Sequence, residues 1–110
     1  MRGRNVRKSN GHRWRQDVDW LRAQGRGCWI CREFGRPDAI DYALPPSHPM
    51  SFSADHLVPV SKGGSLYDRE NLDAAHKACN VWRRDRSVAE VIAIARRSSA
   101  ARQVVATTDW

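Results

Sequence analysis

The chain has 110 residues, which is room for one small domain and excludes an enzyme built from separate cofactor and substrate domains. Hydrophobic residues make up 41% of it and charged residues 28%, the balance of a globular protein rather than of a disordered or collagen-like chain. Nineteen lysines and arginines against twelve acidic residues give a net charge of +7, so a polyanion is the expected partner. No apolar run approaches the roughly 20 residues of a membrane-spanning helix, and none follows the basic N-terminus, so we expect neither a membrane protein nor a secretory signal.

The first elements in chain order are a basic segment and a helix. Residues 1–12 are polar and basic without periodic apolar positions, which predicts a flexible arm. Apolar residues then recur at the spacing of one helical face until Gly25, so a helix is expected over about 13–24. A Cys-x-x-Cys knuckle follows at 28–31, and a candidate short strand at 39–42 precedes a proline-rich loop.

The second half of the chain predicts two short strands and two helices. Residues 50–56 alternate apolar and polar side chains, as a strand does, and a second strand is expected over 71–75. The pattern becomes helical from His76 onward. Ser87 and Glu90 then have the Ser-x-x-Glu form of a capping box, which predicts that another helix begins there.

All three cysteines fall in two short pairs, Cys28-x-x-Cys31 and His76-x-x-Cys79. A tetrahedral Zn²⁺ takes such a set of four soft or borderline ligands, and positions i and i+3 of a helix share one face. The alternatives are a thioredoxin-like redox pair and idle buried thiols. The redox pair expects a βαβ context that this chain lacks, so the pattern favours a structural zinc that supplements a thin core.

A second group of residues surrounds the second pair: Asp55-His56, Gly63-Gly64, Asn71-Leu72 and Asn80. In this order and spacing the chain from Cys28 to Arg86 resembles the HNH endonucleases, in particular small stand-alone HNH proteins of phages and prophages. The resemblance implies an α+β fold with a ββα-metal core and a zinc knuckle, flanked by N- and C-terminal helices. The domain would span residues 13–98, between the arm and a tail over 99–110.

The resemblance also implies an activity, which is cleavage of double-stranded DNA with Mg²⁺ or Mn²⁺ and with low sequence specificity. We expect a location in the cytoplasm of a bacterial host, because neither a membrane segment nor a secretory signal is expected. The resemblance further implies a role in phage DNA packaging beside terminase or portal proteins. The alternative is a catalytically inactive zinc-bound DNA-binding or packaging-accessory module, which leaves Asp55, His56, Asn71 and Asn80 unexplained.

Each of these residues has a role implied by the resemblance. His56 suits a general base because imidazole titrates near neutral pH. Asp55 and Asn80 offer hard oxygen ligands to the catalytic metal. Asn71 would hold the loop and the His56 backbone through amide hydrogen bonds. Adjacent residues of a straight strand face opposite sides, so we expect the strand to end, bulge or twist at residues 55 and 56.

The sequence departs from the commonest family pattern at two positions. The second ligand pair is His-x-x-Cys rather than Cys-x-x-Cys, and Asn80 stands where a histidine is usual. His76 is therefore either the fourth zinc ligand or a third catalytic residue beside a three-ligand zinc. Structural zinc is normally closed by four protein ligands, which favours the first alternative.

Cations near Asn80 are candidates for DNA phosphate contacts, although a solvated helix face would show the same pattern. These residues are Lys77, Arg83, Arg84 and Arg86. The tryptophans at 14, 20, 29 and 82 could stack on bases, but packing in the core is the expected use for them.

Overall fold

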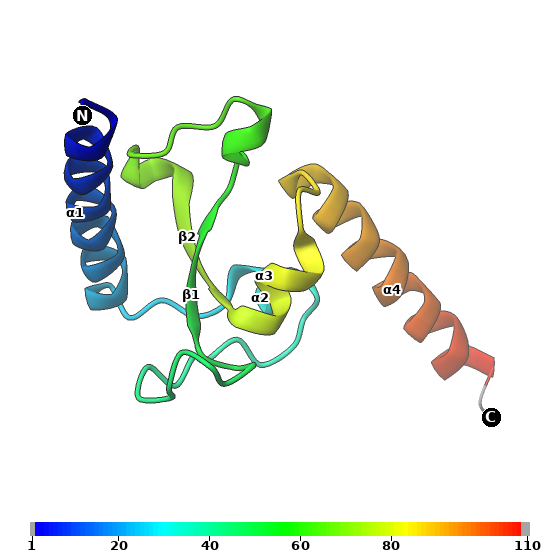
Figure 1. Cartoon of the computed structure of the whole chain (residues 1–110). Coiled ribbons are helices and arrows are strands. Elements are labelled where there is room, and N and C mark those ends of the chain that lie inside the picture. Colours follow the sequence, from blue (N-terminus) through cyan, green and yellow to red (C-terminus); the bar gives the residue numbers. More distant parts are fainter. Residues whose placement is uncertain (1, 109–110) are drawn as a thin grey trace.

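The computed structural model describes the backbone of residues 2–108 and the side chains of residues 11–100. Its elements are α1 (Arg2–Ala23), α2 (Trp29–Glu33), β1 (Phe52–His56), the 3-10 turns η1 (Val60–Lys62) and η2 (Arg69–Asn71), β2 (Leu72–His76), α3 (Lys77–Arg83) and α4 (Val88–Thr108). They form the small α+β fold that the sequence predicted, with both expected strands present (Figure 1). Within the described residues no helix has both the length and the apolar character needed to cross a membrane.

The two strands pair in antiparallel fashion and place two histidines at opposite ends of the sheet. Phe52 lies opposite His76, and His56 lies opposite Leu72. The helix α3 continues directly from β2 and contacts both strands, which completes a ββα unit. Five residues of strand separate the two ends by roughly 13 Å.

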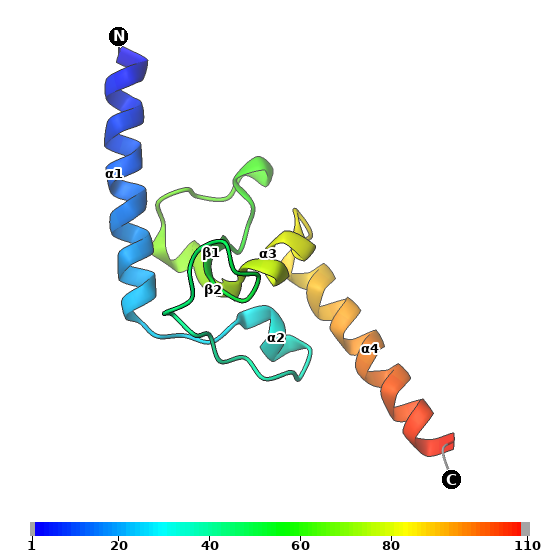
Figure 2. The ribbon, with the colours of Figure 1, turned by 60° about the horizontal axis from the view of Figure 1, so that its bottom comes forward.

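Two long helices flank this unit on different sides. The helix α1 lies alongside the sheet and contacts both strands, whereas α4 begins beside α3 and projects away from the sheet (Figures 1 and 2). The short helix α2 lies between β2 and the start of α4, and contacts both. Each long helix extends past the small core at one of its ends, α1 at its N-terminal end and α4 at its C-terminal end, in opposite directions (Figure 2).

The core is small and includes the cysteines. Its main cluster consists of Cys28, Trp29, Ile30, Cys31, Ala75 and Val91, all buried. Leu21 of α1 and Leu72 of β2 are also buried, at 0% and 1% exposure. Two of the predicted metal ligands are thus core residues, so a metal held by them would stabilise the packing of α2 on β2.

The structure differs from the sequence-based expectation at both ends of the chain. The helix α1 begins at Arg2 rather than near residue 13, so the backbone predicted as an arm continues the helix. Arginine and lysine are good helix formers, and extending an existing helix costs far less than nucleating one. The helix α4 likewise continues to Thr108 through most of the predicted tail; residues 1, 109 and 110 lie outside the described residues.

Residues 39–42 do not form the expected strand, because side chains use the polar groups of this segment. The Ala39 carbonyl accepts a hydrogen bond from the His76 ring, and the Tyr42 carbonyl accepts one from Arg22. The Tyr42 hydroxyl donates to the Arg26 carbonyl at 2.6 Å. The segment therefore ties α1 and β2 together instead of adding a third strand.

The predicted capping box at the start of α4 is confirmed. The Ser87 hydroxyl oxygen accepts from the Glu90 amide at 3.1 Å, and the Glu90 carboxylate accepts from the Ser87 amide at 3.0 Å. The pKa of Glu90 is lowered, first by the backbone hydrogen bond from Ser87 and then by its side chain, since both favour the ionised carboxylate.

Candidate active site and metal centre

Four potential metal ligands meet at the end of the sheet that carries His76. The ligand atoms of Cys28, Cys31, His76 and Cys79 all lie within 4.8 Å of one another. The sulfurs of Cys31 and Cys79 are 3.7 Å apart. Nδ1 of His76 lies 3.4 Å from the Cys31 sulfur and 3.8 Å from the Cys79 sulfur. A tetrahedron with zinc–sulfur bonds of 2.3 Å has edges of about 3.8 Å, so these side chains fit a zinc ion without rearrangement.

The surroundings of the cluster hold its ligands in place. Cys28 caps α2 and its sulfur accepts from the Cys31 amide at 3.4 Å. Nε2 of His76 donates to the Ala39 carbonyl at 3.0 Å, which directs Nδ1 toward the sulfurs, as the outer nitrogen of a zinc-bound histidine usually does. His76 is 2% exposed and belongs to this end of the sheet, away from His56.

The thiols of Cys31 and Cys79 resist ionisation unless a cation is present. Burial raises the pKa of Cys31, and neighbouring Cys28 raises it further. Burial, followed by Cys28 and Cys31, raises the pKa of Cys79 to about 12. Zinc binds thiolates, so its binding to this cluster would displace protons, and the donor set is one that zinc prefers.

His56 stands at the opposite end of the sheet, where β1 ends. Its ring stacks on Trp14 of α1, with centroids 5.1 Å apart and 21° between the planes. Nε2 lies 3.3 Å from the Leu66 carbonyl oxygen, a group that can only accept. Nε2 therefore carries the proton in this contact, and Nδ1 remains as the acceptor that a general base needs.

The loop between the strands is shaped by Asn71 and Gly64. The Asn71 amide donates to the carbonyls of Val58 and Ser65, both at 3.0 Å, and its Oδ1 accepts from the Val58 amide at 2.8 Å. Its side chain thus holds the loop, next to His56 rather than on the His56 backbone itself. A Cβ on Gly64 would lie 1.8 Å from the Val58 carbonyl oxygen, so only glycine fits this close approach.

Asp55 and Asn80 reach this region from β1 and α3. Asp55 is 5% exposed, and its Oδ2 accepts from Trp29 Nε1 at 2.8 Å and from Arg83 Nη1 at 2.6 Å. The Asn80 amide nitrogen donates to Ser53 Oγ at 2.8 Å. Oδ1 of Asp55 and Oδ1 of Asn80 accept no hydrogen bond from the described residues, so each residue retains a hard oxygen of the kind that Mg²⁺ and Mn²⁺ bind.

These residues share one small pocket of about 210 Å³. It is lined by Ala54, Asp55, His56, Pro59, Val60, Asn80 and Arg84. Asp55 and His56 both line the pocket, although they are neighbours in the strand. The strand ends at His56, one of the ways in which both side chains were expected to reach one site.

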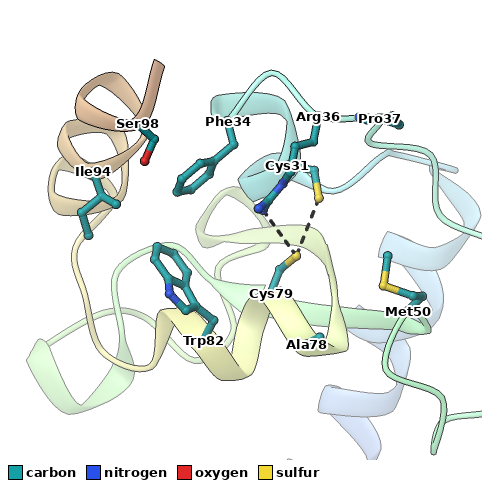
Figure 3. A pocket seen from close by; sticks show the side chains of 10 residues that line it. All are labelled: Cys31, Phe34, Arg36, Pro37, Met50, Ala78, Cys79, Trp82, Ile94 and Ser98. Atoms are coloured by element: carbon teal, nitrogen blue, oxygen red, sulfur yellow. Dashed lines mark hydrogen bonds between the residues drawn. The ribbon is translucent and has the colours of Figure 1, made fainter. Parts of the chain in front are cut away.

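A larger cavity of about 780 Å³ lies on the other side, beside the cysteines. Figure 3 shows Phe34, Trp82, Met50 and Ile94 around it, with Cys31 and Cys79 at its wall. It is mostly apolar and contains none of the pocket residues named above. Cavity size therefore does not locate the polar site in this molecule.

The predicted DNA contacts require one correction. Arg83 is fully buried at 0% exposure and pairs with Asp55, so it is not available to phosphates. Arg86 is partly buried and its guanidinium donates to the carbonyls of Trp82 and Arg83. Lys77 and Arg84 are exposed, and Arg84 lines the pocket. The helical pattern could not reveal this because Arg83 is the last residue of α3 and turns back toward β1.

Sequence analysis also missed two tryptophans that serve the site. Trp14 was expected in the core but stacks on His56, and Trp29, between the first two cysteines, donates to Asp55. The only available signal for Trp29 was its place inside the Cys-x-x-Cys knuckle. The contact of Trp14 depends on how α1 docks on the sheet, which local sequence does not determine.

Comparison with known proteins connects both ends of the sheet to one family. The family model described as HNH endonuclease matches residues 28–86, more than half of the chain. The matched segment contains all four members of the cysteine and histidine cluster and every named residue of the pocket. Searches of curated proteins and of solved structures gave no match. The chain belongs to the HNH endonuclease family.

Proposed function

We propose that this protein is a metal-dependent endonuclease that nicks or cuts double-stranded DNA with low sequence specificity. The observation that carries the proposal is the shared pocket of His56, Asp55 and Asn80, with a base and two hard oxygen ligands. Membership of the HNH family supports hydrolysis of a phosphodiester.

His56 would act as the general base. The Leu66 carbonyl accepts from Nε2, which leaves Nδ1 to take a proton from water as it attacks phosphorus. The stack on Trp14 restricts rotation of the ring. Asn71 holds the loop that supplies the Leu66 carbonyl, so it positions the base rather than touching the substrate.

Asp55 and Asn80 would hold the catalytic Mg²⁺ or Mn²⁺ through their free oxygens. When bound, the ion stabilises negative charge on the phosphate and the leaving oxygen. The residues Cys28, Cys31, His76 and Cys79 would hold a structural zinc at the other end of the sheet. Lys77 and Arg84 are the exposed candidates for contacts with flanking phosphates, supported by the net charge of +7.

The biological setting belongs to the same proposal. Resemblance to small phage and prophage HNH proteins supports a role in DNA packaging beside terminase or portal proteins, in the cytoplasm of a bacterial host. Co-purification of the tagged chain with a terminase from infected cells would support that setting; recovery without any packaging protein would count against it.

The proposal is tested by conversion of supercoiled plasmid to nicked and linear forms with Mg²⁺, Mn²⁺ or EDTA. His56→Ala should lower the rate by roughly 10² to 10⁴-fold, the usual contribution of a general base, while zinc content and plasmid affinity stay unchanged. His48→Ala is the matched control, because His48 is exposed and caps the Met50 amide away from the pocket.

An inactive DNA-binding module predicts a different result. Wild type and His56→Ala would then bind plasmid equally, and neither would cut it with any metal. That outcome would replace the nuclease proposal with a binding function.

A further inference from the structure

Arg83 is a charged side chain buried to 0% exposure, and its guanidinium binds the end of β1. Nη1 donates to Asp55 Oδ2 at 2.6 Å and to the His56 carbonyl at 2.9 Å. Nη2 donates to the Leu57 carbonyl, and Nε donates to the Arg86 carbonyl at 2.9 Å. Arg83 therefore fixes three consecutive residues where the strand enters the pocket.

The carboxylate of Asp55 already accepts two hydrogen bonds, one of which comes from a cation. Oδ2 accepts from Arg83 and also from Trp29, so this oxygen is fully engaged inside the protein. In a buried setting a guanidinium in contact with a carboxylate cancels most of its attraction for a second cation. Only Oδ1 then remains for a metal, with reduced electrostatic support.

The rest of the pocket does not restore negative charge. Asp55 is the one acidic residue among those that line it, Asn80 is neutral, and Arg84 adds a cation at its edge. Hard divalent ions gain affinity from the number of anionic oxygens around them. A pocket whose single carboxylate is paired with arginine should bind such an ion weakly on its own.

We infer that Arg83 is an internal counter-ion of Asp55 and that it makes metal binding at this pocket depend on DNA. A phosphodiester supplies the negative charge and the oxygen that the protein withholds, so metal and DNA would bind together. This inference rests on the proposed function, in which Asp55 and Asn80 are the ligands. Arg83 is a positioning residue, because it acts through Asp55 and touches no substrate.

The first experiment measures Mn²⁺ binding rather than cleavage. The zinc-loaded full chain with His56→Ala serves as the parent, and Mn²⁺ affinity is determined by electron paramagnetic resonance with and without a saturating DNA duplex, after subtraction of Mn²⁺ bound by the duplex alone. We expect DNA to tighten Mn²⁺ binding by about tenfold or more, a usual size for coupling between sites. Linkage requires that Mn²⁺ tighten DNA binding by the same factor. Equal Mn²⁺ affinity with and without DNA would overturn the inference.

Two arginine variants of the parent separate the counter-ion from general positive charge. Arg83→Met should raise the Mn²⁺ affinity of the free protein by about tenfold and reduce the effect of DNA to less than about threefold. Arg96→Met removes an exposed charge of α4 that does not line the pocket, and it should keep the DNA dependence. Unchanged or weaker Mn²⁺ binding by folded Arg83→Met would contradict the inference.

Thermal melting provides a readout that does not require Arg83→Met to be as stable as the parent. Loss of the arginine leaves a buried carboxylate unpaired, so the variant should melt lower, and Mn²⁺ should raise its melting temperature more than that of the parent. If Arg83→Met does not fold, Arg83→Lys takes its place. Arg83→Lys keeps the charge, so its Mn²⁺ binding should still depend on DNA; loss of that dependence would count against the role of Arg83 as a counter-ion.

The outcomes distinguish this inference from the proposed function. His56-dependent nicking together with DNA-independent Mn²⁺ binding would reject the inference alone. DNA-dependent Mn²⁺ binding without nicking would retain the inference for a binding module and reject the nuclease.

Discussion

The two ends of the β1–β2 sheet hold donor groups of contrasting kinds. At the His76 end, three sulfurs and one ring nitrogen lie within 4.8 Å of one another, three of the four residues being buried. At the His56 end, one carboxylate and one amide oxygen border an open polar pocket, and the carboxylate is paired with Arg83. The first end contains everything a zinc ion needs, whereas the second leaves room for groups that come from outside. Under the proposed function, the first end would hold a metal that stabilises the fold, and the second a metal that takes part in the reaction.

Removal of the zinc is predicted to have the greatest effect, because it would unfold the domain. Structural zinc in small domains contributes on the order of 10 kcal/mol, and this core is small. A chelator should release about one zinc per chain and abolish the cooperative melting transition seen by circular dichroism. The variant Cys79→Ser should lack this zinc and show the same loss of the transition. His12→Gln changes an exposed histidine outside the cluster and should retain both. A metal-free protein that melts as the wild type does would remove the contrast between the two ends.

Gly64→Ala should damage the pocket at the His56 end of the sheet (the pocket end) and leave the metal cluster at the His76 end (the zinc end) intact. The new Cβ would lie 1.8 Å from the Val58 carbonyl oxygen, so the loop must move, at a cost of about 1–3 kcal/mol. We expect a lower melting temperature, slower nicking and unchanged zinc content. The control Gly11→Ala adds a Cβ that meets only Arg15 at 3.7 Å within α1, and it should be neutral or slightly stabilising. Normal nicking by Gly64→Ala would show that the loop does not shape the site.

Trp14→Ala should lower kcat by about tenfold with little change in KM, because an unrestrained imidazole spends less time in the reactive orientation. Trp14→Phe keeps an aromatic face and should recover most of the rate. Trp20→Ala removes an indole from the same helix that contacts Arg26 and Arg69 instead of His56, and it should not reproduce the kcat effect. Equal kinetic losses in both alanine variants would mean that α1 acts only through stability.

Glu90→Gln should give the smallest effect, confined to the start of α4. The pKa of Glu90 is lowered in the folded protein, so the capping box stabilises the fold above the ordinary pKa of glutamate and loses this contribution as pH falls through the lowered value. The melting temperature of wild type minus that of Glu90→Gln should therefore shrink toward zero on acidification. The control is Glu33→Gln, which changes an exposed glutamate outside the capping box and is compared with wild type in the same way. A difference that does not change with pH would contradict the role of the carboxylate.

The zinc end could be predicted from sequence almost completely, because its information is local. Two pairs of ligands at fixed spacing, one of them at a helix start, were enough to name all four residues. The ββα-metal fold followed from the resemblance of residues 28–86 to the HNH endonucleases. The capping box at Ser87 was readable for the same reason. Local patterns also predicted both strands within two residues of their observed bounds.

The pocket end could be predicted only in part, because its decisive contacts are between distant segments. Asp55 and Arg83 are 28 positions apart, and Trp14 reaches His56 from another helix. Arg83 lies three residues after Asn80 on a helix, a position that sequence alone suggests for a phosphate contact, but in the fold its side chain is buried. Asp55, His56 and Asn80, which were named from the resemblance, line one pocket, but the partners that orient them depend on tertiary structure.

The seven residues of α3 serve both ends of the sheet: Cys79 faces the sulfur cluster, Asn80 borders the pocket, and Arg83 closes on Asp55. Each residue of an α-helix is turned by about 100° from the one before it. A single insertion or deletion between Cys79 and Arg83 would therefore rotate one set of contacts away from the other, which no nearby substitution could repair. Homologous chains should accept many replacements on the outer surface of α3 and no change in its length.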